Sequence, residues 1–171
     1  IMKLEEFIYD VPDFPKEGIL FKDITPLLQN GAAFKEAISQ MSKIAMELGA
    51  DVIVGPESRG FIFGCPIATE IGKGFVPVRK PNKLPRDVIT ESYELEYGSD
   101  ILCMHKDGIK QGQKVVIVDD LLATGGTIKA ITKMIEKSGG IVAGVVVLID
   151  LKDLNGKELL NDYKVISLLT Y

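Results

Sequence analysis

Residues 115–127 combine side chains suited to binding a phosphate group and a sugar. The apolar run 115–118 predicts a buried strand, and two carboxylates, Asp119 and Asp120, follow it directly. Small and hydroxyl-bearing residues then lead into a helical pattern: Ala123, Thr124, Gly125, Gly126 and Thr127. The first N–H groups of a helix have no partners within it and carry partial positive charge, so they favour a phosphate monoester. Glycine permits close backbone approach, hydroxyls add donors, and paired carboxylates can accept hydrogen bonds from a sugar diol.

The same segment also fits a purely structural turn. A threonine would then cap the helix, and the two carboxylates would only complement the helix dipole. The segment is neither a P-loop, which needs Gly-Lys followed by Ser or Thr, nor a G-x-G-x-x-G dinucleotide turn. Judged from Thr-Gly-Gly-Thr alone, phosphate binding and a structural turn stay equally open.

A second candidate anion loop follows the short apolar run 51–54. Gly55 and Pro56 end that run, and a helix is predicted over 60–71; between them lie Glu57, Ser58 and Arg59. A helix N-terminus with an adjacent guanidinium would bind a second phosphate near the same edge of the sheet. The alternative is a Pro-Gly turn with a surface arginine, which residues 55–60 by themselves favour.

Four cations fall within eight residues of a segment whose prolines and asparagine oppose regular structure: Arg79, Lys80, Lys83 and Arg86. In an acidic chain this is a focused positive patch. Such a segment could attract a polyanion and close over it, and we expect residues 80–92 to be mobile without a ligand. A solvated charged loop is the equally open alternative.

Residues 92–98 alternate acidic with aromatic or aliphatic side chains, a pattern that predicts a strand with Glu94 and Glu96 on one face. The pattern alone does not distinguish a catalytic carboxylate from two solvated glutamates.

The elements that would position these residues alternate between strand and helix. An amphipathic helix is predicted over 31–48, and the apolar runs predict strands at 51–54, 74–78, 114–118, 141–149 and, as an edge, 164–169. This order indicates an α/β fold with a doubly wound, mainly parallel sheet flanked by helices, in one domain covering 1–171. Ligands bind such sheets beyond the carboxyl ends of the strands.

Composition limits the function classes. The 171 residues carry a net charge of −4, and the pI is about 5.1, which argues against nucleic acid as a partner. Cys65 and Cys103 are too few for a disulfide framework and indicate reduced thiols in a cytoplasmic protein. No apolar run is long enough for a membrane span, and no signal peptide is recognisable.

Taken together, residues 115–127 closely resemble the motif with which type I phosphoribosyltransferases bind phosphoribosyl pyrophosphate (PRPP). The resemblance implies that Asp119, Asp120 and residues 123–127 hold the ribose and its 5-phosphate. Residues 55–60 resemble the pyrophosphate loop of the family, which implies a cis peptide between Glu57 and Ser58. The implied pyrophosphate contacts are Glu57, Ser58, Arg59, Arg79, Lys80 and Lys83.

The stretch 13–28 is similar to that of family members that use adenine, which implies that residues 1–30 contribute a small hood over the base. Backbone groups near Leu20 and Lys22 would then bind the adenine edge, with apolar surface from Leu20 and Phe21 and with Arg59 nearby. Lys22 stands where some members have arginine. The resemblance also implies that Glu96 acts as general acid or base at the purine imidazole and that Arg59 assists catalysis at the leaving group.

The implied reaction joins adenine to PRPP and gives AMP and diphosphate, with Mg²⁺ held mainly by substrate and water rather than by a protein cage. The family is usually dimeric, so a homodimer in the cytoplasm is expected. Two other functions stay open: transfer to xanthine or another 6-oxopurine, and a PRPP-sensing regulator.

Overall fold

The computed structural model describes residues 2–95 and 98–171. The chain divides into two compact units, Ile1–Gln40 and Met41–Tyr171, which we describe separately. Helix α2 (Gly31–Glu47) runs across the boundary between them and matches the helix predicted over 31–48.

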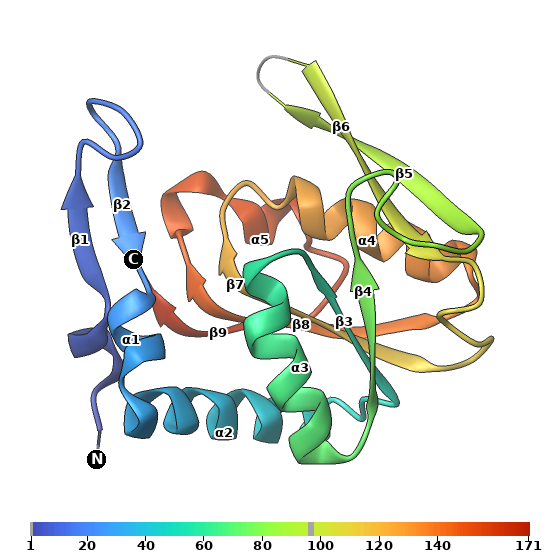
Figure 1. The fold of residues 1–171 in the computed structure, drawn as a ribbon, viewed down its shortest axis with the longest axis horizontal. Coiled ribbons are helices and arrows are strands. Elements are labelled where there is room, and N and C mark those ends of the chain that lie inside the picture. The colour runs from blue at the N-terminus through green and yellow to red at the C-terminus, as the bar shows by residue number, and fades with distance from the viewer. Residues whose placement is uncertain (1, 96–97) are drawn as a thin grey trace. The chain divides into compact units, whose positions relative to one another are not determined.

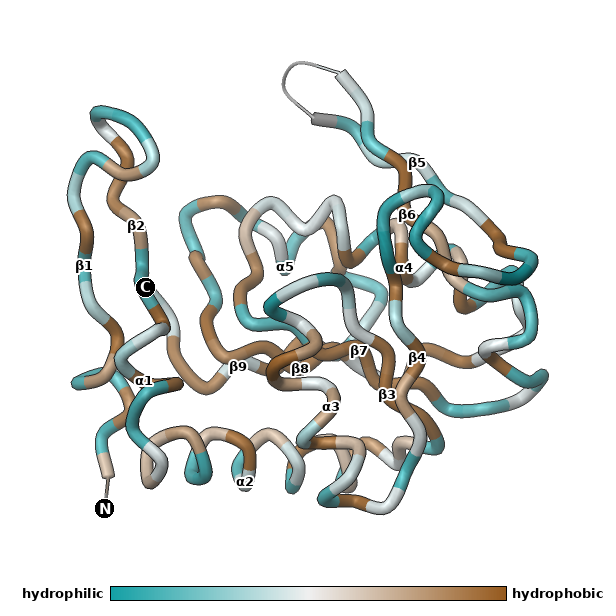
Figure 2. Tube along the Cα trace, viewed as in Figure 1, coloured by the Kyte–Doolittle hydropathy of each residue, from teal (hydrophilic) through white to brown (hydrophobic). Residues whose placement is uncertain are grey.

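The larger unit contains a five-stranded parallel sheet in the order β4-β3-β7-β8-β9 (Figure 1). The strands are β3 (Val52–Pro56), β4 (Gly74–Val78), β7 (Lys114–Leu122), β8 (Ile141–Asp150) and β9 (Val165–Thr170). All five residues of β3 are buried between its two neighbours, and Figure 2 shows the central strands as largely hydrophobic. The α/β parallel fold is confirmed, with β9 at the predicted edge.

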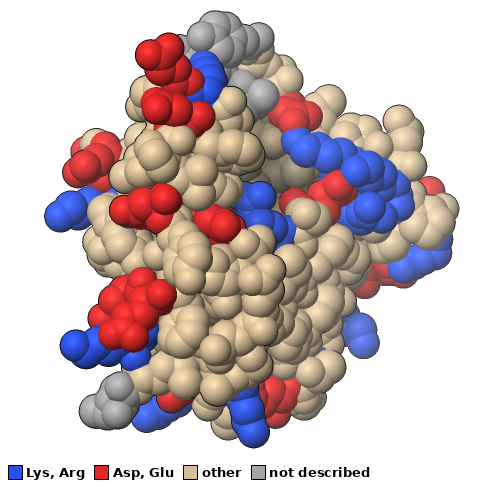
Figure 3. Space-filling model, turned by 60° about the vertical axis from the view of Figure 1, so that its left-hand side comes forward, with Lys and Arg blue, Asp and Glu red and all other residues tan. Residues whose placement is uncertain are grey.

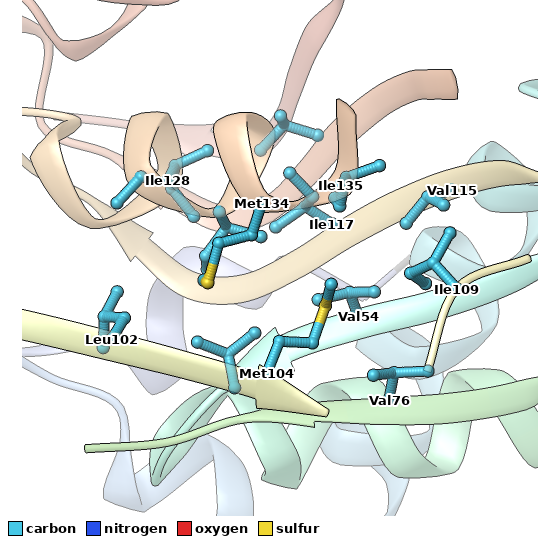
Figure 4. Close-up of a cluster of buried hydrophobic side chains, with 14 of the residues drawn as sticks. Val54, Val76, Leu102, Met104, Ile109, Val115, Ile117, Ile128, Met134 and Ile135 are labelled. Carbon is cyan, nitrogen blue, oxygen red and sulfur yellow. The ribbon is translucent and has the colours of Figure 1, made fainter. Parts of the chain in front are cut away.

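Helices connect the strands and cover the sheet. Helix α3 (Arg59–Ile71) joins β3 to β4 and packs on β3 and β7, whereas α4 (Gly126–Lys137) joins β7 to β8. In Figure 4, Ile128, Met134 and Ile135 of α4 lie over Ile117 of β7. The apolar stripe of α4 is therefore used to bury the central strand. Short helices η2 (Lys152–Leu154) and α5 (Gly156–Leu159) follow β8.

An antiparallel hairpin adds to the same core. Strands β5 (Val88–Leu95) and β6 (Gly98–His105) pair with Tyr93 opposite Asp100. Leu102 and Met104 of β6 are buried in the cluster beneath α4 (Figure 4). The pattern at 92–98 predicts a single strand, whereas the described residues of this range belong to the end of β5 and the start of β6, and β6 was not predicted. Residues 96 and 97 lie outside the described part of the chain, so the predicted shared face of Glu94 and Glu96 is not tested.

The smaller unit holds η1 (Leu4–Phe7), β1 (Tyr9–Pro12), β2 (Leu20–Asp23) and α1 (Thr25–Gln29). The two strands form an antiparallel ribbon. Phe14 packs edge to face on Phe21, with 5.1 Å between ring centroids, and Lys22 Nζ donates to Asp10 Oδ1 at 2.5 Å. Across residues 2–95 and 98–171, no helix is long and apolar enough to cross a membrane.

Candidate active site

The segment predicted to bind phosphate lies at the carboxyl end of β7. The strand continues beyond the predicted limit at 118, because Leu121 and Leu122 still pair with Ile149 and Asp150 of β8. Asp119 and Asp120 therefore lie within the strand instead of after it. A cavity of about 100 Å³ is lined here by Asp119 and by residues 121–128. The structure thus brings all the predicted ribose and phosphate residues to one place except Asp120, which lines the neighbouring cavity.

The N-terminus of α4 is open to a ligand. Its N-cap is Gly125, in the left-handed conformation with φ of 91°, and in the described structure no side chain caps this end. The alternative of a threonine cap is therefore wrong. A Cβ on Gly125 would come within 3.1 Å of the Gly156 carbonyl oxygen. Glycine is needed here both for its φ and for the close approach of α5.

The two carboxylates have different surroundings. Asp120 is nearly buried, and its Oδ2 accepts a hydrogen bond from Arg59 Nε at 2.5 Å. The charge of Asp120 is the main cause that raises the pKa of Arg59. Removal from water, followed by the charge of Asp120, raises the pKa of Asp119 well above its ordinary value. Asp119 therefore holds a proton more tightly than an ordinary carboxyl does.

The loop between β3 and α3 lies against this site. Its Glu57–Ser58 peptide is cis, as the family resemblance implied. A Cβ on Gly60 would lie 3.2 Å from Asp119 Oδ1, and one on Gly55 would lie 3.0 Å from the Val118 carbonyl oxygen, so both glycines permit the close approach of the two loops. The loops share a cavity of about 180 Å³ lined by Pro56, Glu57, Ser58, Arg59, Asp119, Asp120, Leu121 and Thr127.

The cationic segment meets the same loop through Glu57. Arg79 Nε and the Lys80 backbone N–H donate to Glu57 Oε1, and Lys83 Nζ donates to Oε2. The structure therefore groups three of the predicted pyrophosphate residues around the carboxylate of a fourth, Glu57, whereas Arg59 pairs with Asp120. Arg86 stands apart from them and bonds to Asp107 at 2.5 Å. On the face drawn in Figure 3, the largest group of basic side chains lies at the upper right with acidic side chains against it, and other basic side chains are scattered over the face.

The Lys80 side chain is held by two residues that were not predicted from the sequence. Its Nζ donates to Tyr93 Oη at 2.9 Å and to Asp100 Oδ2. Burial lowers the pKa of Lys80, but the hydrogen bonds to Asp100 and Tyr93 raise it above its ordinary value. The register of the β5–β6 hairpin brings these two side chains together. Only a prediction of that hairpin could have found them.

The base contacts proposed in the smaller unit are not tested by the described geometry. Leu20, Phe21 and Lys22 belong to the smaller unit, where Leu20 is exposed and the other two are half-buried. Glu96 lies outside the described residues. Their roles stay predictions.

Comparison with known proteins first shows the class of protein to which the chain belongs. Residues 23–170 match the family described as phosphoribosyl transferase domain. A protein of Streptococcus thermophilus described as adenine phosphoribosyltransferase is 55% identical over 170 residues, which cover 99% of each chain.

Solved structures agree with the sequence relatives. The adenine phosphoribosyltransferase of Thermoanaerobacter pseudethanolicus superposes with a TM-score of 0.95 at 51% identity, covering 99% of this chain and 100% of the other. That of Rhodothermus marinus gives 0.91 at 44% identity, covering 98% and 96%. The chain belongs to the adenine phosphoribosyltransferase family.

Proposed function

We propose that the protein transfers the 5-phosphoribosyl group of PRPP to adenine, giving AMP and diphosphate in purine salvage. One observation supports this most directly: two loops, each leading into a helix, share one cavity together with paired carboxylates. PRPP carries a phosphate at one end and a pyrophosphate at the other, so it needs two separate anion sites with a diol site between them. Family membership favours adenine as the acceptor.

The 5-phosphate would bind at the N-terminus of α4. The backbone N–H groups that follow Gly125 are not capped by a side chain in the described structure, and the hydroxyls of Thr124 and Thr127 are close by in the chain. Both the helix dipole and the free donors favour an anion here. Ala123 and Gly126 leave room for the phosphate oxygens to approach the backbone.

The ribose hydroxyls would be held by Asp119 and Asp120. Asp120 already accepts a hydrogen bond from Arg59, so its remaining acceptor sites serve one hydroxyl, and Asp119 serves the other. As the bond to pyrophosphate breaks, the ribose gains positive charge. The two carboxyl groups then lie near the developing cation and stabilise it more than they stabilise the ground state.

The departing pyrophosphate gains negative charge and would be stabilised by Arg59, Arg79, Lys80 and Lys83. Asp119 and Asp120 provide oxygen donors of the kind that Mg²⁺ prefers, and substrate oxygens would supply most of its other ligands. When bound, Mg²⁺ would neutralise part of the charge on the pyrophosphate. Preorganised cations in a partly enclosed site need little rearrangement as this charge develops.

Adenine would be held by the hood residues Leu20, Phe21 and Lys22, with Glu96 handling a proton at the imidazole ring and Arg59 nearby. A general acid or base of this type typically contributes about 10²- to 10⁴-fold in rate. A homodimer and a cytoplasmic location complete the proposal, on the strength of the family resemblance.

The test is a competition among equal amounts of adenine, hypoxanthine, guanine and xanthine with PRPP and Mg²⁺. We expect AMP to dominate the nucleotides that form. Dominant IMP, GMP or XMP would reject adenine as the base and favour the 6-oxopurine alternative. If no nucleotide forms although PRPP binds, the regulator alternative is favoured.

A further inference from the structure

The carboxylate of Glu57 lies at the centre of the cationic group. Its Oε1 accepts hydrogen bonds from Arg79 Nε at 3.2 Å and from the Lys80 backbone N–H at 2.9 Å, and its Oε2 accepts one from Lys83 Nζ at 2.5 Å. The Glu57 side chain is only 15% exposed, whereas Arg79 and Lys83 are 35% and 45% exposed. Glu57 thus faces inward, and its cationic partners face solvent.

An ionised Glu57 is poorly suited to touch pyrophosphate. Burial raises the pKa of Glu57, but hydrogen bonds from Lys83 and the Lys80 backbone, together with nearby positive charges, bring it below its ordinary value. The side chain is therefore an anion at neutral pH and repels another anion at close range. A direct contact between Glu57 and pyrophosphate, which the family resemblance implied, conflicts with this charge.

The backbone fixes Glu57 relative to the cations. Pro56 pairs with Val78 at the ends of β3 and β4, and the Glu57 N–H donates to the Val78 carbonyl at 2.9 Å. Beyond Lys80, Asn82 adopts the left-handed conformation with φ of 69°, so the chain reverses and brings Lys83 back to the carboxylate. Groups 22 to 26 residues away in sequence therefore meet one rigid acceptor.

The contacts of Glu57 leave its cations able to bind a second anion. The bond from Arg79 uses Nε, so the two terminal nitrogens of the guanidinium remain outside this contact. An ammonium has three protons, and Lys83 uses one of them on Glu57. Both side chains can thus keep the carboxylate and still donate to a phosphate oxygen.

We propose that Glu57 is a positioning residue, which holds Arg79, the Lys80 backbone and Lys83 as one preorganised cradle for pyrophosphate and does not bind pyrophosphate itself. The proposal rests on the proposed function. It gives Glu57, an anion, the task of holding the cations that bind pyrophosphate. Long cationic side chains lose considerable rotamer freedom when a ligand orders them, and an internal anion removes part of that loss beforehand.

The test measures dissociation constants of inorganic pyrophosphate, with Mg²⁺, and of AMP by titration calorimetry. Glu57→Gln keeps the size of the side chain but removes its charge and turns an amide N–H₂ toward Lys83 or Lys80. We expect pyrophosphate to bind at least about tenfold more weakly and AMP to bind within about twofold of the parent. A general loss of structure would weaken both ligands, so the difference between them separates positioning from folding.

A matched control is Glu91→Gln. Glu91 is also 15% exposed and also pairs with a lysine, Lys137 at 2.6 Å, but it makes no described contact with the cationic group. Both dissociation constants should stay within about twofold of the parent in this variant. Glu57→Asp serves if the glutamine variant does not fold, because a carboxylate shorter by one methylene cannot reach all three donors and should also weaken pyrophosphate.

The proposal is overturned if Glu57→Gln binds pyrophosphate as tightly as the parent or more tightly. The carboxylate would then have no effect on pyrophosphate binding or would oppose it. Equal weakening of AMP and pyrophosphate overturns the proposal as well. If the parent forms AMP and binds pyrophosphate while the variant is unchanged, only the positioning role fails. If the parent forms no nucleotide, the proposed function itself fails.

Discussion

The neighbouring carboxylates of β7 should respond in opposite ways to loss of charge. Asp119 has a pKa raised by removal from water and by the charge of Asp120, whereas Asp120 is paired with Arg59 at 2.5 Å. Asp119→Asn should therefore stabilise the fold at neutral pH while it impairs the use of PRPP. Asp120→Asn should destabilise the fold, because Arg59 loses its charged partner.

The pH dependence follows from linkage. A carboxyl whose pKa is raised on folding holds its proton more tightly in the folded state. Below the pKa of the unfolded state, near 3.8, this carboxyl therefore does not lower the free energy of unfolding. As the pH rises from there to the pKa of the folded state, the carboxyl makes the fold progressively less stable. Asp119→Asn does not carry this cost, so it should melt at a higher temperature than the parent at pH 7.5, where each 1 kcal/mol of added stability moves Tm by about 2–4 °C in a chain of this size.

Thermal melts at pH 7.5 and pH 3, together with steady-state kinetics, provide the assay. The gain in Tm of Asp119→Asn should become small near pH 3, below the unfolded pKa, where the parental carboxyl is mostly protonated in both states. Its kcat/KM for PRPP should fall about 10- to 100-fold, in keeping with a lost hydrogen bond to a charged group worth about 1.5–3 kcal/mol. Asp120→Asn should lose about 1 kcal/mol, a modest amount because Arg59 is half exposed. A lower Tm for Asp119→Asn at pH 7.5 refutes the electrostatic reasoning, and an unchanged kcat/KM for PRPP refutes the diol role.

Two further predictions concern the loops. Gly125→Ala should destabilise the fold by about 1–2 kcal/mol, since φ is 91° and the new Cβ meets Gly156. The same substitution should raise the KM for PRPP. A KM equal to that of the parent would show that the N-cap geometry is unimportant for binding. Mobility was expected over 80–92, but residues 88–92 pair with β6 as part of β5, so the prediction is applied to residues 80–87. Hydrogen exchange there should slow when PRPP and Mg²⁺ are added, more than exchange in α2, because the segment is held mainly through polar contacts to Glu57, Tyr93, Asp100 and Asp107. Protection that is already strong in the free protein would contradict a closing segment.

The sequence predicted the sheet well because its strands are apolar runs between clear turn residues. The predicted C-terminal end of β7 was wrong by four residues. The strand continues through its carboxylates because β8 pairs with it there, and the local sequence pattern does not show that pairing. Strand β6 was missed for a related reason: it joins a hairpin of mixed polarity, where pairing and packing under α4 decide the structure. Tyr93 and Asp100 were missed with it.

Sequence spacing alone also could not show how the two anion loops come together, since this depends on strand order. Strands β3 and β7 are neighbours in the sheet. After β3 the chain passes through α3 to β4 on one side of this pair, and after β7 it passes through α4 to β8 on the other side. A crevice forms at such a reversal, outside the carboxyl ends of the two strands. The shared cavity lies there, and the absence of side chains at Gly55 and Gly60 lets the loops close around it. The strand order thus places an arginine from one helix N-terminus against a carboxylate of the adjacent strand, where a substrate with two anionic ends can span both loops.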